Sequence, residues 1–141
     1  MILKFFNKEE RSSKESDLIN VACLMIHAAK IDENYTDKEK TIIKNTLIKL
    51  NNNDEDIDKI ILDAEKKESD SNHIQDFTKN IKAMDKDNKI EIVKDIWTII
   101  LSDGSSDMYE ENLMRRLAGL LYVDAKTMGD IKLDIQTKQK Q

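Results

Sequence analysis

The sequence of 141 residues contains no proline, three glycines and one cysteine. Chains made of many short strands and turns use proline and glycine at those turns, so their scarcity favours an all-α fold. A single cysteine excludes an internal disulfide. No apolar run reaches the ~20 residues that a membrane-spanning helix needs, and charged residues follow the apolar start of the chain too soon for a signal peptide. We therefore expect a cytoplasmic protein without stable insertion into a membrane.

The balance of residue types indicates one soluble, globular domain. Charged residues make up 36% of the chain and hydrophobic residues 39%, which is typical of a folded domain. The formal net charge is −5, from 23 basic and 28 acidic residues. Binding to a nucleic acid generally needs a basic face, so we expect no nucleic-acid partner.

Apolar residues recur at helical spacing along most of the chain and predict an all-α helical bundle. Residues 18–31 and 90–101 are apolar around most of the helix surface, which is typical of central, buried helices. We expect Trp97 and Tyr122 to lie in the core. The side chains predicted to cap helix starts are Asp17, Thr36, Asp54 or Asp56, Asp87 or Asn88, Asp107 and Asp124.

Composition also suggests how the chain is divided. Residues 1–16 read as an amphipathic segment, in which Leu3, Phe5 and Phe6 are expected to pack back onto the domain, followed by a polar linker over 11–16. Residues 17–138 form the predicted helical domain, and residues 139–141 a disordered tail.

Two parts of the sequence resemble each other. The same spacing of 71 residues separates Asp32 from Asp103 and Glu39 from Glu110. Each part has an apolar helix, an acidic loop and a second helix that begins with a capping-box pattern. Neither helical hairpin buries its apolar helix alone, so we expect two pseudo-symmetric halves that share one core.

The second acidic loop carries a resemblance to a known family. Ser102-Asp103-Gly104, then Asp107-Met108-Tyr109-Glu110-Glu111 and the apolar helix that follows, is similar to TerB, the tellurite-resistance protein B family, over about residues 15–138. The resemblance implies a compact all-α bundle of about seven helices in two related halves, a role in stress response and no enzymatic activity. It also implies acidic loops that have been suggested to bind metal. Glu33 stands where the family usually has a glycine.

The acidic loops have two interpretations. Asp32, Glu39, Asp103 and Glu110 would form a four-carboxylate site for Ca²⁺ or Mg²⁺ if the two loops lie close together, because these cations prefer oxygen ligands. Alternatively, the same residues cap two helices, each cap contributing roughly 1 kcal/mol. We favour capping, since the spacing matches no established metal loop, and expect no required cofactor.

Cys23 and His27 lie four residues apart, within reach of a shared metal on one helix face. No second pair of such ligands exists, so a buried thiol beside a hydrogen-bonded histidine is the favoured interpretation. The sequence also lacks nucleophile-elbow, phosphate-loop and zinc-protease motifs.

Three functions stay open at this stage. The first is a non-enzymatic interaction module of the TerB type, with a protein partner bound by a surface groove or an apolar patch and no convergent titratable pocket. The second is a sensor of a divalent cation bound by the acidic loops. The third, with the least support, is a metal-dependent hydrolase that uses paired carboxylates. A homodimer is compatible with the sequence but nothing in it requires one.

Overall fold

Seven α-helices make up almost all of the described chain. The computed structural model describes residues 2–31, 33, 35–50, 56–103 and 106–140, without the side chains of residues 2–14 and 103. These ranges contain no strand, which confirms the predicted all-α class. The elements in chain order are α1 (Ile2–Lys30), α2 (Asp37–Leu50), α3 (Ile57–Asp70), α4 (Gln75–Ile81), α5 (Lys86–Ile100), the short 3₁₀ helix η1 (Leu101–Asp103), α6 (Met108–Leu120) and α7 (Ala125–Gln139).

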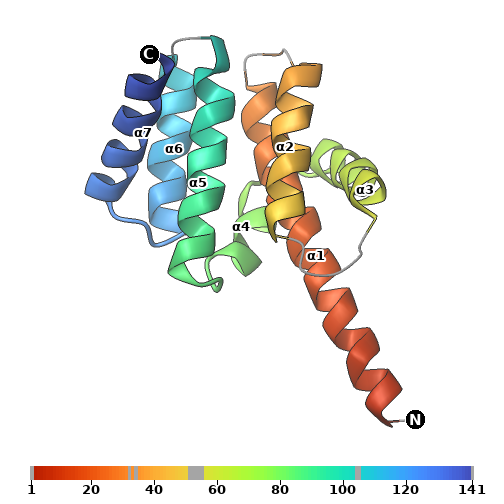
Figure 1. Cartoon of the computed structure of the whole chain (residues 1–141). Coiled ribbons are helices and arrows are strands. Elements are labelled where there is room, and N and C mark those ends of the chain that lie inside the picture. Colours follow the sequence, from red (N-terminus) through yellow and green to blue (C-terminus); the bar gives the residue numbers. More distant parts are fainter. Residues whose placement is uncertain (1, 32, 34, 51–55, 104–105, 141) are drawn as a thin grey trace.

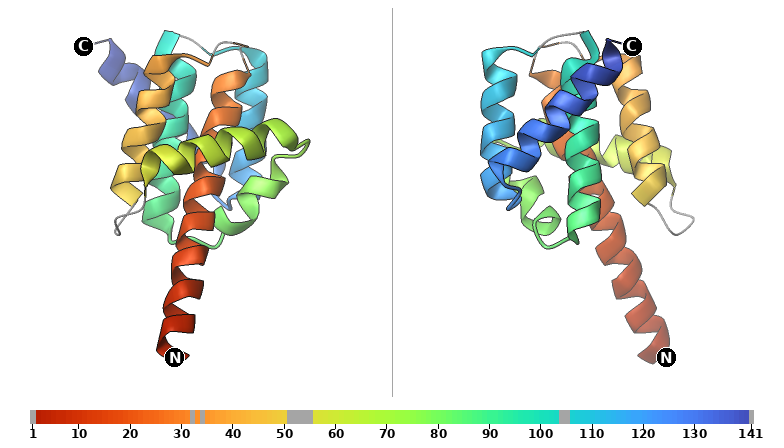
Figure 2. Two further views of the ribbon diagram at one scale, coloured as in Figure 1. Left: turned by 90° about the vertical axis from the view of Figure 1, so that its right-hand side faces the viewer. Right: turned by 60° about the vertical axis from the view of Figure 1, so that its left-hand side comes forward.

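The helices form two groups of three that lie side by side, with α4 between them (Figure 1). In each group the first helix packs against the third, α1 against α3 and α5 against α7. Figure 2 shows that the third helix crosses the first in both groups. The groups meet where α1 and α2 contact α5. The repeat in the sequence therefore corresponds to two three-helix units rather than to two hairpins.

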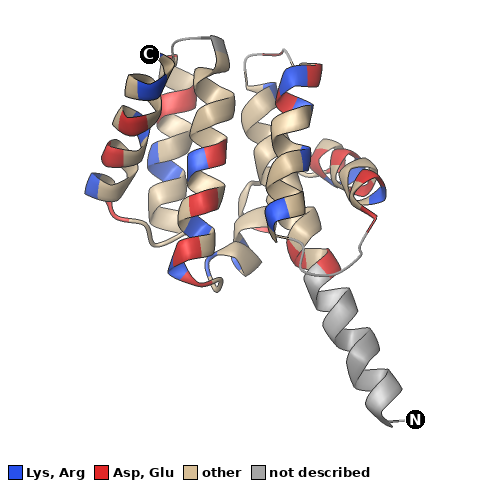
Figure 3. Ribbon diagram, in the orientation of Figure 1, with Lys and Arg blue, Asp and Glu red and all other residues tan. Residues whose placement is uncertain are grey.

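The core is built around α1 and α5. The segment from Val21 to Ile26 is completely buried, and Ile92, Val93 and Ile96 of α5 are buried to the same degree. Full burial of one large aliphatic side chain contributes roughly 1.5–3 kcal/mol. Figure 3 shows no charge on α1 between its acidic residues near 17 and its end, whereas α3 and α7 carry charges along their outer faces. The prediction of two central helices is confirmed.

Most predicted helix starts are confirmed. Asp56, of the two alternatives given, caps α3, and Asp107 and Asp124 cap α6 and α7. The prediction for α5 is wrong, because its cap is Asp85, whose side chain accepts a hydrogen bond from the Asn88 N–H at 2.8 Å. The helix thus begins earlier than either Asp87 or Asn88 would allow.

The ends of the chain also differ from the sequence prediction. The helix α1 continues through 11–16, so this stretch is not a linker in the structure and Asp17 lies inside a helix rather than at its start. Serine, lysine and glutamate all tolerate a helix, and neither proline nor glycine interrupts the stretch. At the other end α7 includes Gln139, whose amide donates to the Leu101 carbonyl at 2.8 Å, where a tail was expected.

Two aromatic predictions have opposite outcomes. Trp97 is 3% exposed and lies in the core as expected, whereas Tyr122 is 74% exposed and the prediction for it is wrong. The expected contacts of Leu3, Phe5 and Phe6 concern side chains outside the described residues. Within the described ranges, no helix has both the length and the hydropathy that crossing a bilayer requires.

Candidate functional site

Glu39, one of the four predicted metal ligands, holds the start of α2. Its Oε1 accepts hydrogen bonds from the Thr36 N–H at 2.8 Å and from the Thr36 hydroxyl at 2.9 Å. The Glu39 N–H in turn donates to Thr36 Oγ1 at 3.2 Å. This is the reciprocal capping box that the sequence indicates. The glutamate is 4% exposed, so the cap is shielded from water.

Glu110 occupies the same place in the second half. The Asp107 N–H donates to Glu110 Oε1 at 3.1 Å, and the Glu110 N–H donates to Asp107 Oδ1 at 2.8 Å. Glu110 is 5% exposed. Both predicted capping boxes are therefore present, one at the start of the second helix in each half.

The other two predicted ligands cannot be placed against these caps. Asp32 and the side chain of Asp103 lie outside the described residues. Within the described part of the chain, no group of three or more histidine, cysteine, aspartate or glutamate side chains is positioned to hold a metal ion. The four-carboxylate site thus stays a prediction, while the capping role of two of its members is observed.

Glu33, in the first acidic loop, has a backbone conformation that favours glycine. Its φ is 63°, in the left-handed region, and its N–H donates to the Lys30 carbonyl at 2.9 Å just beyond the end of α1. A residue with a Cβ pays roughly 1–2 kcal/mol for this conformation. Glu33 therefore lowers the stability of the fold relative to a glycine at this position.

Cys23 and His27 face different partners. The Cys23 thiol donates to the Ala64 carbonyl at 3.4 Å, and burial raises the pKa of this thiol to about 11. His27 Nδ1 lies 3.4 Å from Glu68 Oε1, and the Lys30 ammonium binds Glu68 Oε2 at 2.7 Å. These contacts join α1 to α3, and they fit the predicted buried thiol beside a hydrogen-bonded histidine.

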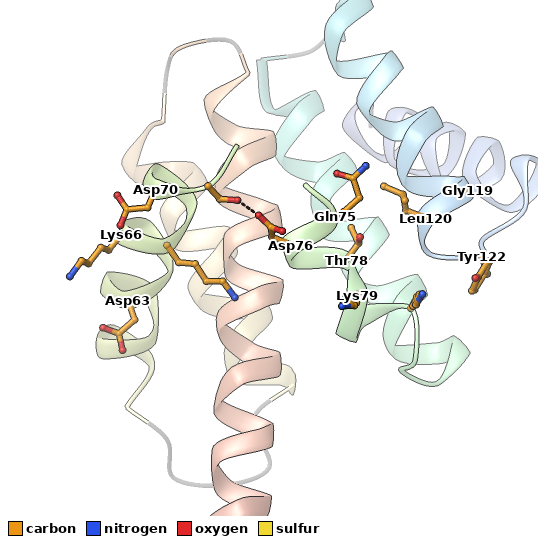
Figure 4. A pocket seen from close by; sticks show the side chains of 13 residues that line it. Asp63, Lys66, Asp70, Gln75, Asp76, Thr78, Lys79, Gly119, Leu120 and Tyr122 are labelled. Atoms are coloured by element: carbon orange, nitrogen blue, oxygen red, sulfur yellow. Dashed lines mark hydrogen bonds between the residues drawn. The ribbon is translucent and has the colours of Figure 1, made fainter. Parts of the chain in front are cut away.

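A groove of about 1020 Å³ lies across α3, α4 and the end of α6. Figure 4 shows that side chains of α4 form one wall and that Gly119, Leu120 and Tyr122 form the opposite one. Gly119 leaves this wall open, because a Cβ built there meets no atom within 4 Å. The groove combines segments that are far apart in the sequence, and no local pattern indicated it.

Tyr122 lines this groove in a strained conformation. Its φ is 58°, and it stands just after the end of α6. The Tyr122 N–H donates to the Gly119 carbonyl at 3.4 Å and the Val123 N–H to the Ala118 carbonyl at 3.0 Å. This is the Schellman arrangement, in which the position of Tyr122 is usually a glycine. The sequence contained one indication of this strain. No glycine follows the end of α6, so a residue with a Cβ has to take the left-handed position.

Lysines surround the same helix end. The Lys89 ammonium donates to the Leu121 carbonyl at 3.1 Å and to the Lys82 carbonyl at 3.3 Å. Lys79 of α4 and Lys82, which follows the end of this helix, are exposed and line the groove. Among the residues that the structure describes, neither side chain has an ion-pair or hydrogen-bond partner. These two charges are therefore available to a bound molecule.

Together these features define a small all-α domain of two related halves, with capped acidic loops and an open groove at one end of the bundle. The chain belongs to the TerB family, because the family model described as "Tellurite resistance protein TerB" matches residues 18–133. No curated protein and no solved structure is similar enough to the chain to count as a match.

Proposed function

We propose that this TerB-family chain is a non-enzymatic interaction module of a stress response, and that it binds a protein partner in the groove between α4 and the end of α6. The observation that carries the proposal is the groove itself. It exposes an aromatic side chain and two lysines without ion-pair partners among the described residues. Aromatic side chains in a hollow are common anchors of protein–protein contacts.

The acidic residues favour this function over a metal-dependent hydrolase. A hydrolase of that kind needs carboxylates that are free to hold a metal or to move a proton. Glu39 and Glu110 instead accept hydrogen bonds from the backbone at their own helix starts. Cys23 is a poor nucleophile, since its thiol is buried and its pKa is raised.

The test uses two glycines that differ only in their place. Gly119 lies in the groove and Gly129 on α7, and a Cβ at either position meets no atom within 4 Å. We expect both Gly119→Trp and Gly129→Trp to fold, as measured by circular dichroism and melting temperature. Partners that copurify with the tagged full chain should be lost with Gly119→Trp and kept with Gly129→Trp.

Two results would contradict the proposal. The first is a partner that binds both variants equally, which would place the binding surface elsewhere. The second is turnover of a phosphoester by the purified chain that disappears when Glu39 or Glu110 is replaced by glutamine. That result would assign catalysis to residues that we interpret as caps.

A second candidate function is the sensing of Ca²⁺ or Mg²⁺ by the acidic loops. One observation favours it: both hydrogen bonds that Glu39 accepts from Thr36 use Oε1, so its Oε2 is the oxygen that a cation would take. Melting of chelator-treated protein with each cation tests this candidate. A cation at a hundred times its Kd adds about 2.7 kcal/mol, whereas a protein that does not bind it melts unchanged.

A further inference from the structure

We infer that the groove recognises an acidic peptide segment that also carries an apolar side chain. The segment would place its carboxylates against Lys79 and Lys82 and its apolar side chain on Tyr122 and Leu120. This inference rests on the proposed function and names the chemistry of the partner. The observations that carry it are the strain at Tyr122 and the positions of Lys79, Lys82 and Lys89 around the end of α6.

The Schellman end of α6 requires the left-handed conformation at position 122, but nothing in the described part of the chain requires a tyrosine there. The side chain is 74% exposed, so it contributes little packing, and its φ of 58° is costly for any residue with a Cβ. Glycine would satisfy the same Schellman hydrogen bonds without that cost. Strained residues that persist without a packing role are often found at functional sites. A bound apolar group would give the exposed ring a contact.

The charges beside Tyr122 are positive. Lys79 lies on α4 and Lys82 directly follows its last residue, and Lys89 is fixed close by through the Lys82 and Leu121 carbonyls. Asp76, the acidic residue of α4 in this groove, is held by the Ser71 hydroxyl at 2.6 Å, the dashed line in Figure 4. Lys79 and Lys82 together outweigh the single negative charge of Asp76, so residues 75–82 give this part of the groove a net positive charge.

Charged side chains of α3, both acidic and basic, also line the groove. In Figure 4 Asp63, Lys66 and Asp70 point away from α4 and α6, toward the outer side of α3. The groove thus has a mixed outer wall and a cationic inner end beside an aromatic ring. A peptide with one or two carboxylates close to an aliphatic or aromatic side chain fits this inner end, and a basic peptide does not.

The experiment selects peptides from a random library displayed on phage, with the full-length chain as bait. We expect the selected peptides to be enriched in aspartate and glutamate next to an apolar residue. Synthetic copies of them should bind the chain in solution, as measured by fluorescence anisotropy. Selected peptides that are neutral or basic, or the absence of any enrichment, would overturn the inference.

Two pairs of variants test the residues. Tyr122→Gly should raise the Tm by a few degrees, because it removes backbone strain. It should also lower the affinity for the selected peptides at least tenfold. Glu33→Gly relieves the same strain at the second described non-glycine residue with positive φ and should raise the Tm without changing the affinity for the peptides. Unchanged binding by Tyr122→Gly would contradict the anchor role. A structural role alone would not predict a more stable chain that binds less.

Charge reversal makes the second pair. The double variant Lys79→Glu with Lys82→Glu should bind the acidic peptides with at least tenfold lower affinity, and this difference should be smaller at high salt. Lys38→Glu with Lys140→Glu is the control, because both residues are exposed and lie on other elements. If both double variants lose the same affinity for the peptides, the effect comes from the net charge of the chain rather than from the groove, and the inference is overturned.

The outcomes separate this inference from the proposed function. If Gly119→Trp abolishes capture of a partner but the selected peptides are not acidic, the groove binds a partner of another chemistry. If the chain forms a dimer in gel filtration that Lys79→Glu with Lys82→Glu disrupts, the occupant is a second copy. Either result overturns the inference, and only the first leaves the groove as a site for a different protein.

Discussion

Removal of the α6 cap tests the assignment of the acidic loops to helix capping. The side chain of Asp107 accepts a hydrogen bond from the Glu110 N–H at 2.8 Å, while the Glu110 carboxylate accepts one from the Asp107 N–H at 3.1 Å. Asp107→Ala removes the first bond and keeps the second. Because Asp107 is exposed, the substitution costs little packing and isolates the cap.

Its magnitude follows from other helix caps. Replacement of an aspartate N-cap by alanine lowers the free energy of unfolding by about 1 kcal/mol, within a range of about 0.5–2 kcal/mol. For a domain of 141 residues, a loss of this size lowers the Tm by roughly 3–5 °C. Thr36→Ala removes the equivalent cap of α2 and should cost a similar amount, since the two capping boxes have the same arrangement.

Urea unfolding followed by circular dichroism measures both losses. Asp107→Ser is the matched control, because serine is also a good N-cap and should restore all but a few tenths of a kcal/mol. The measurements are made with EDTA and again with Ca²⁺ or Mg²⁺. The reasoning is refuted if Asp107→Ala changes nothing in EDTA, or if the cost appears only when a cation is present.

Three further predictions concern stability. Tyr35→Phe should leave the free energy of unfolding unchanged or raise it by about 1 kcal/mol in urea unfolding, because the Tyr35 hydroxyl is buried without a hydrogen-bond partner among the described residues; a loss of that size would show that the hydroxyl is bonded in solution. Gly129→Ala should raise the Tm, since alanine costs about 0.5–1 kcal/mol less than glycine inside a helix and a Cβ meets no atom there; a lower Tm would contradict the open space at this position. Burial alone would raise the pKa of the Glu111 carboxyl. Hydrogen bonds from Lys132 and Ser106 outweigh this effect, so the pKa of Glu111 lies below its ordinary value. Because the pKa is lower in the folded state, ionised Glu111 stabilises the fold at pH values above the ordinary pKa of 4.5. This stabilisation is lost as the pH falls through the pKa of the folded state. Glu111→Gln should therefore flatten the decrease of Tm below about pH 5, and an unchanged slope would contradict this.

The sequence predicted those features of the fold that depend on short segments. Apolar spacing indicated the buried helices α1 and α5, and local capping patterns located the starts of α2 and α6. A cap needs only the side chain of one residue and the backbone three residues further on, so a single sequence reveals it. The repeat was recognisable for the same reason.

The start of α5 shows where local patterns are insufficient. Asp85, Asp87 and Asn88 are all good caps, and nothing in the segment itself distinguishes them. When α5 starts after Asp85, Lys89 lies inside the helix and its ammonium reaches the Leu121 carbonyl at 3.1 Å. That contact joins residues 32 positions apart, so the choice involves tertiary structure.

The candidate site was the least predictable part. The acidic residues attracted the functional interpretation because they recur, yet the two whose side chains are described hold helix starts. The groove depends on α3, α4 and the end of α6 coming together, and Tyr122 was assigned to the core because it follows two leucines. Its positive φ and exposure depend on how α6 ends, which the spacing of apolar residues does not reveal.

The most direct test of a partner in the groove is site-specific photo-crosslinking in living cells. A photoreactive phenylalanine derivative is placed at Gly119, in the groove, and at Gly129, on α7, where the structure has room for a side chain in both cases. We predict a discrete cross-linked product from position 119 that is absent from position 129. A product from position 129 alone, or the same product from both positions, would contradict binding in the groove.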